Sequence, residues 1–395
     1  MTGSGEAQDP ARLESVHFPA TGSWEVKFGP ARIVFGAGAL SRLGELVRDL
    51  GGSRALLVTD PGVRAAGHVE QAERSLRDAG IRVAVFDGVE ENPTTRHVDD
   101  GVRQALATGV DHLIGLGGGS AMDCAKGINF LLTNGGELAD YWGTNLATRP
   151  LLPSVGIPTT AGTGSEVQSY ALIEQEDTRR KMACGDDKAR FRAVILDPEL
   201  TGTQPPRVAA LSGMDAISHV VESYVSAAAN PISRMYAREA WELLEGTFEP
   251  AIDAPAEIEP RGRMLIGAHL AGASIECSML GAAHACANPL TSRFGVSHGA
   301  AVLLMLPHVI RFNMAAVGPL YDDLLRRASR PSRSLAERIE ELRERGGLPA
   351  RLADVAVPRD ALAELAADAA EQWTLKFNPR AATKTELQEL YESAY

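Results

Sequence analysis

Residues 111–132 read DHLIGLGGGSAMDCAKGINFLL, an apolar run that ends in three glycines and continues into a stretch with helical spacing. The short apolar run suits a buried parallel strand. Glycines let the N–H groups at a helix N-terminus approach a phosphate closely, although tight turns also use glycine. Ser120, Asp123 and Lys126 follow at three-residue spacing on one helical face, which favours a phosphate site. The stretch therefore predicts a strand, a glycine turn and a helix.

The segments around this stretch repeat the alternation of strand and helix. Apolar runs at 54–60 and 81–88 predict strands, and 67–80 and 91–109 have helical spacing. This alternation predicts a parallel sheet covered on both faces.

From about Pro205 the spacing is helical almost throughout. We therefore predict a loose tail at 1–22, an α/β domain at 23–203 and an all-helical domain at 204–395. The boundary falls in the segment 197–207, which is rich in Pro, Gly and Thr as linkers tend to be.

Composition limits the kind of protein. The 395 residues are 45% hydrophobic and 23% charged, as in a soluble globular chain of two domains. The net charge of −12 opposes binding to nucleic acid. The most apolar run, 300–310, is short for a membrane span, and the first residues do not resemble a signal peptide. The four cysteines form no CxxC pair, so we expect them to be reduced thiols. Together with the absence of a signal-peptide pattern and of a long apolar run, this leads us to expect a cytoplasmic protein with no membrane partner.

The segment GMDAISHVVES, residues 213–223, has candidate metal ligands. Asp215 and His219 are four residues apart on a predicted helix and therefore point the same way. A carboxylate and an imidazole at this spacing can share one divalent metal, or they can form only a local hydrogen bond.

A second pair of histidines extends this candidate site. In HACANPLTSRFGVSH, residues 284–298, His284 and His298 are fourteen residues apart. A straight helix would separate them by roughly 21 Å. Pro289 and Gly295 lie between them, and either can break a helix so that His298 folds back. One Asp and three His would then surround a divalent ion with positions open for a substrate oxygen.

Two further features lie near the glycine turn. IPTTAGTGSEV, residues 157–167, is rich in hydroxyls and glycines and would either wrap an adenosine or pyrophosphate or form only a Thr-rich turn. Only six of the 39 basic residues are lysines, and Lys126, Lys181 and Lys188 are three of them. Because Lys is a compact charge that Arg does not always replace, their retention hints at function.

The chain resembles the iron-containing (group III) alcohol dehydrogenase family. The resemblance depends on motifs in the family's order and spacing: GGGSAMDCAK (117–126), PTTAGTGSE (158–166), GMDAISHVVESYVS (213–226), HACANPLTSRFGVSHG (284–299) and LPHVIRFN (306–313), with NPR (378–380) as a weaker tail motif. It implies an α/β N-terminal dinucleotide-binding domain with a parallel sheet and an all-α C-terminal domain, a plan shared with dehydroquinate synthase. A metal would lie in the cleft between the domains.

The resemblance also implies roles for individual residues. The metal ligands would be Asp215, His219, His284 and His298. Gly118, Gly119 and Ser120 would bind the pyrophosphate, with Asp123 close by. The other cofactor contacts would be Asp60, Asn92, Thr159, Thr160, Thr163, Lys181 at the ribose, and Leu200.

Asp60 bears on the choice of cofactor. The resemblance places it facing the adenosine ribose, where a carboxylate accepts hydrogen bonds from both hydroxyls and repels a 2′-phosphate. We therefore expect a preference for NAD over NADP. Alternatively, Asp60 only caps the turn at Pro61 and Gly62.

The chain departs from the family at Asn288. Family members often have a second histidine four residues after the third ligand, which is thought to relay protons or contact substrate. Asn288 cannot exchange a proton near neutral pH, although it can still contact substrate.

These observations predict a metal-dependent, NAD(H)-linked alcohol dehydrogenase or aldehyde reductase. It would pass hydride between the nicotinamide and a small alcohol or aldehyde. The family resemblance makes Fe²⁺ the first expected metal, and three imidazoles and a carboxylate would also suit Zn²⁺. We expect a homodimer or a larger homo-oligomer. The alternatives are a metal-free reductase like maleylacetate reductase, a sugar-phosphate cyclase of the dehydroquinate synthase type, and a non-catalytic sensor of nucleotide and metal.

Overall fold

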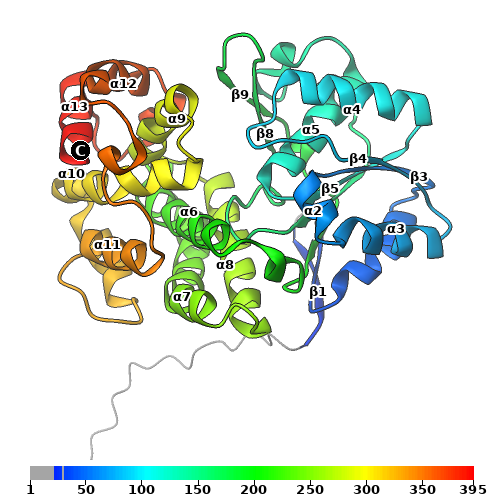
Figure 1. Ribbon diagram of the computed structural model, residues 1–395, viewed down its shortest axis with the longest axis horizontal. Coiled ribbons are helices and arrows are strands. Elements are labelled where there is room, and N and C mark those ends of the chain that lie inside the picture. The colour runs from blue at the N-terminus through cyan, green and yellow to red at the C-terminus, as the bar shows by residue number, and fades with distance from the viewer. Residues whose placement is uncertain (1–21, 29–30) are drawn as a thin grey trace, which may run out of the picture.

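The computed structural model describes residues 22–28 and 31–395, so nearly all of the tail predicted at 1–22 lies outside the described residues. An α/β part and a helical part lie side by side (Figure 1). The strands are β1 (Trp24–Phe28), β2 (Ala31–Phe35), β3 (Arg54–Val58), β4 (Arg82–Phe86), β5 (His112–Gly117), β6 (Gly143–Thr144), β7 (Ser154–Pro158), β8 (Tyr170–Glu174), β9 (Lys181–Gly185) and β10 (Ala193–Leu196). The α-helices are α1 (Leu43–Asp49), α2 (Pro61–Ala65), α3 (His68–Asp78), α4 (Thr95–Thr108), α5 (Gly119–Asn134), α6 (Pro206–Val225), α7 (Pro231–Asp253), α8 (Ile258–Glu276), α9 (Ala282–Phe294), α10 (His298–Arg326), α11 (Leu335–Arg345), α12 (Leu362–Ala370) and α13 (Lys384–Ser393).

The main sheet has the predicted parallel architecture. Its order is β1-β2-β10-β7-β5-β3-β4, and every neighbouring pair is parallel except the edge pair β1–β2. Successive residues of a strand face opposite sides. Leu57 therefore packs with α1 and α3, whereas Leu56 and Val58 pack with α4 and α5. Both faces are covered, which explains why the strands are continuous apolar runs.

A second, three-stranded sheet was not predicted. Its order is β6-β9-β8, with β8 and β9 paired antiparallel from Tyr170↔Gly185 to Glu174↔Lys181. Both strands contribute buried residues, such as Ile173 and Met182, to the same apolar cluster as α4 and α5. This small sheet places Lys181 beside the cleft between the two parts of the chain.

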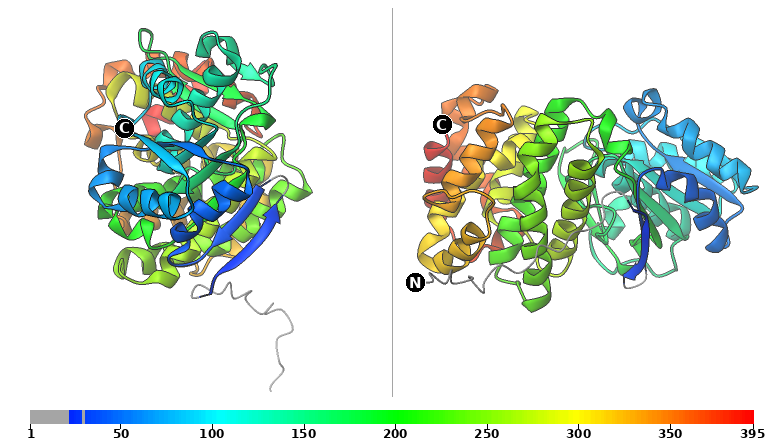
Figure 2. Two further views of the ribbon diagram at one scale, coloured as in Figure 1. Left: turned by 90° about the vertical axis from the view of Figure 1, so that its right-hand side faces the viewer. Right: turned by 90° about the horizontal axis from the view of Figure 1, so that it is seen from below.

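The helical part is organised around α6. From Gly213 to Val225 every residue of α6 is buried, polar ones included, because α7, α8 and α10 surround it. A helix enclosed in this way is apolar around most of its circumference. The same core includes Phe35 of β2 and Leu196 of β10, so the helical part packs against one end of the main sheet, as Figure 2 shows.

The helix break predicted between His284 and His298 is present, but only one of the two expected residues makes it. Pro289 lies inside α9, whereas Gly295 ends α9 in the left-handed conformation, with φ of 64°. Residues 296 and 297 then lead into α10.

Helix α10 is longer than the apolar run 300–310 suggested. Among the described helices only α10 is long and apolar enough, by length and composition, to cross a membrane. The interior of the helical part buries 61% of its most apolar window, so the core accounts for its apolar character.

Candidate active site

The glycine turn joins β5 to α5, as the sequence predicts, and it lines the cavities described below. Gly118 is the N-cap residue of α5 and has no side chain that could cap the first N–H groups of the helix. A Cβ on Gly119 would lie 2.8 Å from Thr163 Cγ2, and one on Gly117 would lie 2.8 Å from Ala121 Cβ. The close packing requires glycine, and the exposed N–H groups suit an anion such as a phosphate.

Two adjoining cavities extend from this turn. One of about 600 Å³ is lined by residues that include Asp60, Gly118, Ser120, Thr159 and Thr160. The other, of about 490 Å³, we call the inner cavity. Residues predicted from sequence that line it are Asn92, Gly119, Ser120, Asp123, Thr163, Lys181, Asp215, His219, His284, Asn288 and His298. Ser120 lines both cavities, so the sequence-predicted residues line two adjoining cavities.

Leu200 differs from the other predicted cofactor contacts. Its side chain is buried in the apolar core beside β2 and β10 and lines neither of the two cavities. The structure therefore gives it a packing role.

Lys126 does not face the glycine turn. Its Nζ is buried and donates to the carbonyl of Ser165 at 2.7 Å, to Ser165 Oγ at 3.0 Å and to the carbonyl of Tyr170 at 2.8 Å. Asp123 accepts a hydrogen bond from Ser165 Oγ and one from the N–H of Leu172 at 3.1 Å. These two side chains of α5 hold the segment that carries the threonine loop, and Lys126 is not available to a phosphate.

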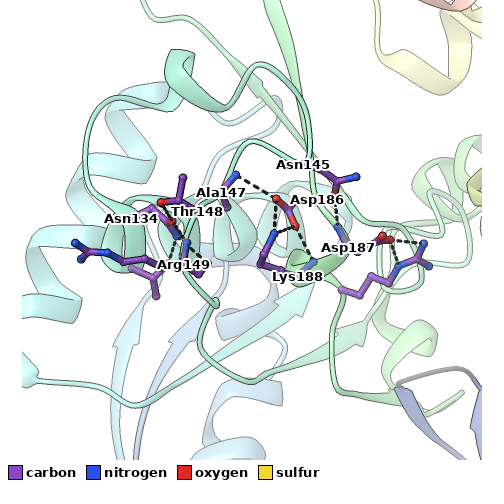
Figure 3. Close-up of polar contacts among 10 residues, drawn as sticks. Asn134, Asn145, Ala147, Thr148, Arg149, Asp186, Asp187 and Lys188 are labelled. Atoms are coloured by element: carbon purple, nitrogen blue, oxygen red, sulfur yellow. Dashed lines mark hydrogen bonds and ion pairs between the residues drawn. The ribbon is translucent and has the colours of Figure 1, made fainter.

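Of the other two lysines, Lys181 lines the inner cavity and Lys188 does not. Lys188 pairs with buried Asp186 at 3.0 Å, and Asp186 also accepts from the N–H of Ala147 at 3.2 Å (Figure 3). Lys181 donates to Asn92 Oδ1 at 3.3 Å, and Asn92 has a φ of 55° that turns the chain there. Of the three lysines, only Lys181 therefore remains a candidate cofactor contact.

The four candidate metal ligands meet at the far end of the inner cavity. Asp215 Oδ1 lies 3.6 Å from His219 Nε2 and 3.9 Å from His284 Nε2. The centroid of the His284 ring lies 5.1 Å from the centroid of the His219 ring and 5.3 Å from that of the His298 ring. Ligand atoms of Asp215, His284 and His298 all fall within 4.8 Å of one another. The break at Gly295 is what brings His298 back to α6.

The donor atoms of this cluster fit a divalent ion. Asp215 Oδ1 and His284 Nε2, which lie 3.9 Å apart, are buried and have no hydrogen-bond partner among the described residues. His219 turns its Nε2 toward the same Asp215 Oδ1. Buried polar atoms normally have partners, because leaving one unpaired costs about 1–3 kcal/mol. One carboxylate and three imidazoles form a ligand set suited to Fe²⁺ or Zn²⁺.

Protonation also favours ligation. Burial lowers the pKa of His298 to about 3, and burial is likewise the main reason that the pKa of His219 is lowered. Burial alone would raise the pKa of Asp215, but the surrounding imidazoles outweigh it and lower that pKa. At neutral pH His219 and His298 are therefore neutral and Asp215 is ionised, which are the states that bind metal.

An outer cavity of about 850 Å³ adjoins the inner one and shares Lys181, Asn288, Gln372 and Trp373 with it. Asn288 Nδ2 donates to Gln372 Oε1 at 2.9 Å. The Trp373 ring stacks on Tyr170 of β8 with centroids 5.9 Å apart. Gln372 and Trp373 were not predicted as site residues, and no local pattern around them marks them.

Comparison with known proteins identifies the family. The family model for iron-containing alcohol dehydrogenase matches residues 30–198, and that for the C-terminal part of the Fe-containing alcohol dehydrogenase family matches residues 209–395. The chain belongs to the iron-containing alcohol dehydrogenase family.

Its relatives are dehydrogenases and reductases. The chain is 31% identical to the NAD-dependent methanol dehydrogenase of Bacillus methanolicus, over 93% of this chain and 99% of the relative. It is 34% identical to the 1,3-propanediol dehydrogenase of Klebsiella pneumoniae, over 91% and 96% of the two chains. A solved alcohol dehydrogenase from Oenococcus oeni has a TM-score of 0.90 at 28% identity, over 95% and 100%. The chain is an oxidoreductase of this family, which sets aside the cyclase and the non-catalytic sensor.

Proposed function

We propose that the protein is a divalent-metal-dependent, NAD(H)-linked dehydrogenase that interconverts a small alcohol and its aldehyde. One observation carries the proposal. Two adjoining cavities lead from an uncapped helix N-terminus to a cluster of one carboxylate and three imidazoles, in which Asp215 Oδ1 and His284 Nε2 have no partner among the described residues. The relatives act, by name, on methanol and 1,3-propanediol, which supports a small substrate.

The α/β part would bind the dinucleotide along this path. The N–H groups at Gly119 and Ser120 would bind the pyrophosphate, and Asp60 would accept hydrogen bonds from the adenosine ribose. Lys181, held by Asn92, would contact the ribose on the side of the metal cluster. When bound, the dinucleotide supplies or accepts the hydride.

The helical part would hold the metal. Asp215, His219, His284 and His298 would be its ligands, with Fe²⁺ favoured by the family and Zn²⁺ also compatible with the donors. When bound, the ion stabilises negative charge on the substrate oxygen. The ligand set favours this mechanism over a metal-free reductase.

Asn288 limits how protons move in the site. Its amide is held by Gln372 and has no proton to exchange near neutral pH. A proton released by the alcohol would therefore leave through water in the outer cavity, which adjoins the inner one at Asn288.

Removing ligands tests the proposal. His284→Ala and His298→Ala should each lose bound metal. Loss of a residue that only hydrogen-bonds a ligand can lower activity by roughly 100-fold. Loss of the ligand itself should therefore lower the rate of NADH oxidation with short aldehydes by more than this. His308→Gln is the matched control, because His308 is on the same helix as His298 but lines none of the three cavities. Full metal content and turnover in both alanine variants would refute the four-ligand site.

We also propose a cytoplasmic location and a homo-oligomer, as expected from the sequence and its family resemblance. Light scattering on the purified chain tests the assembly, and a monomeric mass would contradict it.

A further inference from the structure

Helix α6 presents a third functional side chain beside its two candidate ligands. Asp215, His219 and Glu222 occupy positions i, i+4 and i+7, which lie on one helical face. Glu222 is only 4% exposed, and a carboxylate buried to this degree needs partners. Its partners among the described residues lie at the N-terminal end of α9, the helix that carries His284.

Glu222 contacts the ring of His284 and the backbone next to it. Its Oε2 lies 2.6 Å from His284 Nδ1, and its Oε1 accepts a hydrogen bond from the N–H of Ala283 at 2.7 Å. An ionised carboxylate can only accept, so Nδ1 carries the proton that it donates to Glu222. The opposite nitrogen, Nε2, then has a lone pair, and this is the unpartnered atom that lies 3.9 Å from Asp215 Oδ1.

We propose that Glu222 is a positioning residue for the metal site, which fixes the tautomer and the orientation of His284. The inference rests on the metal dependence in the proposed function. A carboxylate behind a ligating imidazole raises the basicity of the ligand and prevents the ring from turning. Glu222 thus belongs to the site although it touches neither substrate nor cofactor.

A second residue supplies a matched control. Asn378, of the NPR tail motif, accepts a hydrogen bond from the N–H of Ala282 at 3.2 Å and so caps the same end of α9. A Cβ on Gly281 would lie 2.9 Å from Asn378 Oδ1 and 3.1 Å from Glu222 Oε1, so the two caps converge on one turn. Among the described residues, the side chain of Asn378 hydrogen-bonds Ala282, Asn313 and Arg380 but not the ring of His284, which Glu222 contacts directly.

The experiment compares Glu222→Gln with Asn378→Ala in the full chain. Each protein is stripped of metal with a chelator and titrated with Zn²⁺ alone, and its melting temperature is recorded without metal. Glu222→Gln keeps the size of the side chain but not its charge, and its Zn²⁺ dissociation constant should rise about 10–100-fold. Asn378→Ala should lower the melting temperature while its Zn²⁺ affinity stays near that of the wild type. Co²⁺ reports the same difference, because its visible spectrum should change only in Glu222→Gln.

Three results would overturn the inference. Unchanged Zn²⁺ affinity in Glu222→Gln would show that His284 needs no positioning. An equal loss of affinity in Asn378→Ala would assign the effect to the end of α9 rather than to the ring. A wild-type protein that binds no Zn²⁺ would defeat the metal dependence in the proposed function as well, whereas the first two results leave that function intact.

Discussion

Asp60 uses one carboxylate oxygen in a structural contact, and its other oxygen has no hydrogen-bond partner among the described residues. Its Oδ1 accepts a hydrogen bond from the N–H of Val63 at 2.9 Å, which caps α2. Its Oδ2 lies toward the glycine turn, since a Cβ placed on Gly117 would be 3.2 Å away. The same side chain lines the cavity beside Gly118, Thr159 and Thr160. Capping and ribose binding are therefore compatible, because they use different atoms.

Replacing Asp60 tests whether it selects the cofactor. We expect the wild type to prefer NAD, and Asp60→Gly to improve kcat/KM with NADP more than it harms kcat/KM with NAD, because the charge that repels a 2′-phosphate is gone. Glycine is tolerated at an N-cap position at a cost of a few tenths of a kcal/mol. Asp60→Ser is the control that keeps a capping oxygen without the charge, and it should shift the ratio in the same direction. A wild type that already prefers NADP, or an unchanged ratio in Asp60→Gly, would exclude this role.

The helices of the C-terminal part are joined by a buried ionic contact as well as by apolar packing. Arg338 of α11 is 2% exposed, and its Nε donates to Glu245 Oε1 of α7 at 2.7 Å. Its Nη2 donates to Glu249 Oε1, one turn further along α7, at 3.2 Å. The contact holds α11 against α7. Loss of Arg338 would leave the buried carboxylate of Glu245 without a cation, whereas Glu249 would keep Arg330 at 2.8 Å.

Arg338→Ala should therefore destabilise the protein strongly. Breaking a buried pair by removing one partner costs about 3–5 kcal/mol, because the remaining charge stays buried. The matched control is Arg333→Ala, since Arg333 pairs with Glu337 but its side chain is 90% exposed. An exposed pair contributes at most about 1 kcal/mol. Urea unfolding of both variants measures the difference, and similar free energies of unfolding would contradict the argument.

The sequence predicts those parts of the molecule that depend on the local spacing of apolar and polar residues. The strands around residues 54–58 and 112–117 follow from short apolar runs, and the ligand pair on α6 follows from the spacing of four. The β8–β9 hairpin could not be predicted in this way, since its stability depends on packing against α5. The stacking of Trp373 on Tyr170 joins segments that are far apart in the chain, so no local sequence pattern could predict this contact.

Trp373 connects the two halves of the molecule at the mouth of the site. It belongs to the short helical segment Trp373–Phe377 of the helical part, and it stacks on Tyr170 of the α/β part with an interplanar angle of 26°. It lines both the inner and the outer cavity, so its indole stands where the two meet. The size of substrate that the inner cavity admits should depend on this ring.

Trp373→Ala should widen the range of substrates toward longer chains. Without the indole the inner and outer cavities merge, and an aldehyde such as hexanal can place its tail in the added space. Each buried methylene contributes about 0.8 kcal/mol, so the ratio of kcat/KM for hexanal to that for propanal should rise by up to roughly 4-fold per added methylene. Trp142→Ala is the control, because Trp142 lines only the outer cavity of the two. Trp373→Phe should stay close to the wild type, since phenylalanine can still stack on Tyr170. A ratio that is unchanged in Trp373→Ala, or that rises equally in Trp142→Ala, would show that this indole does not set the limit on substrate length.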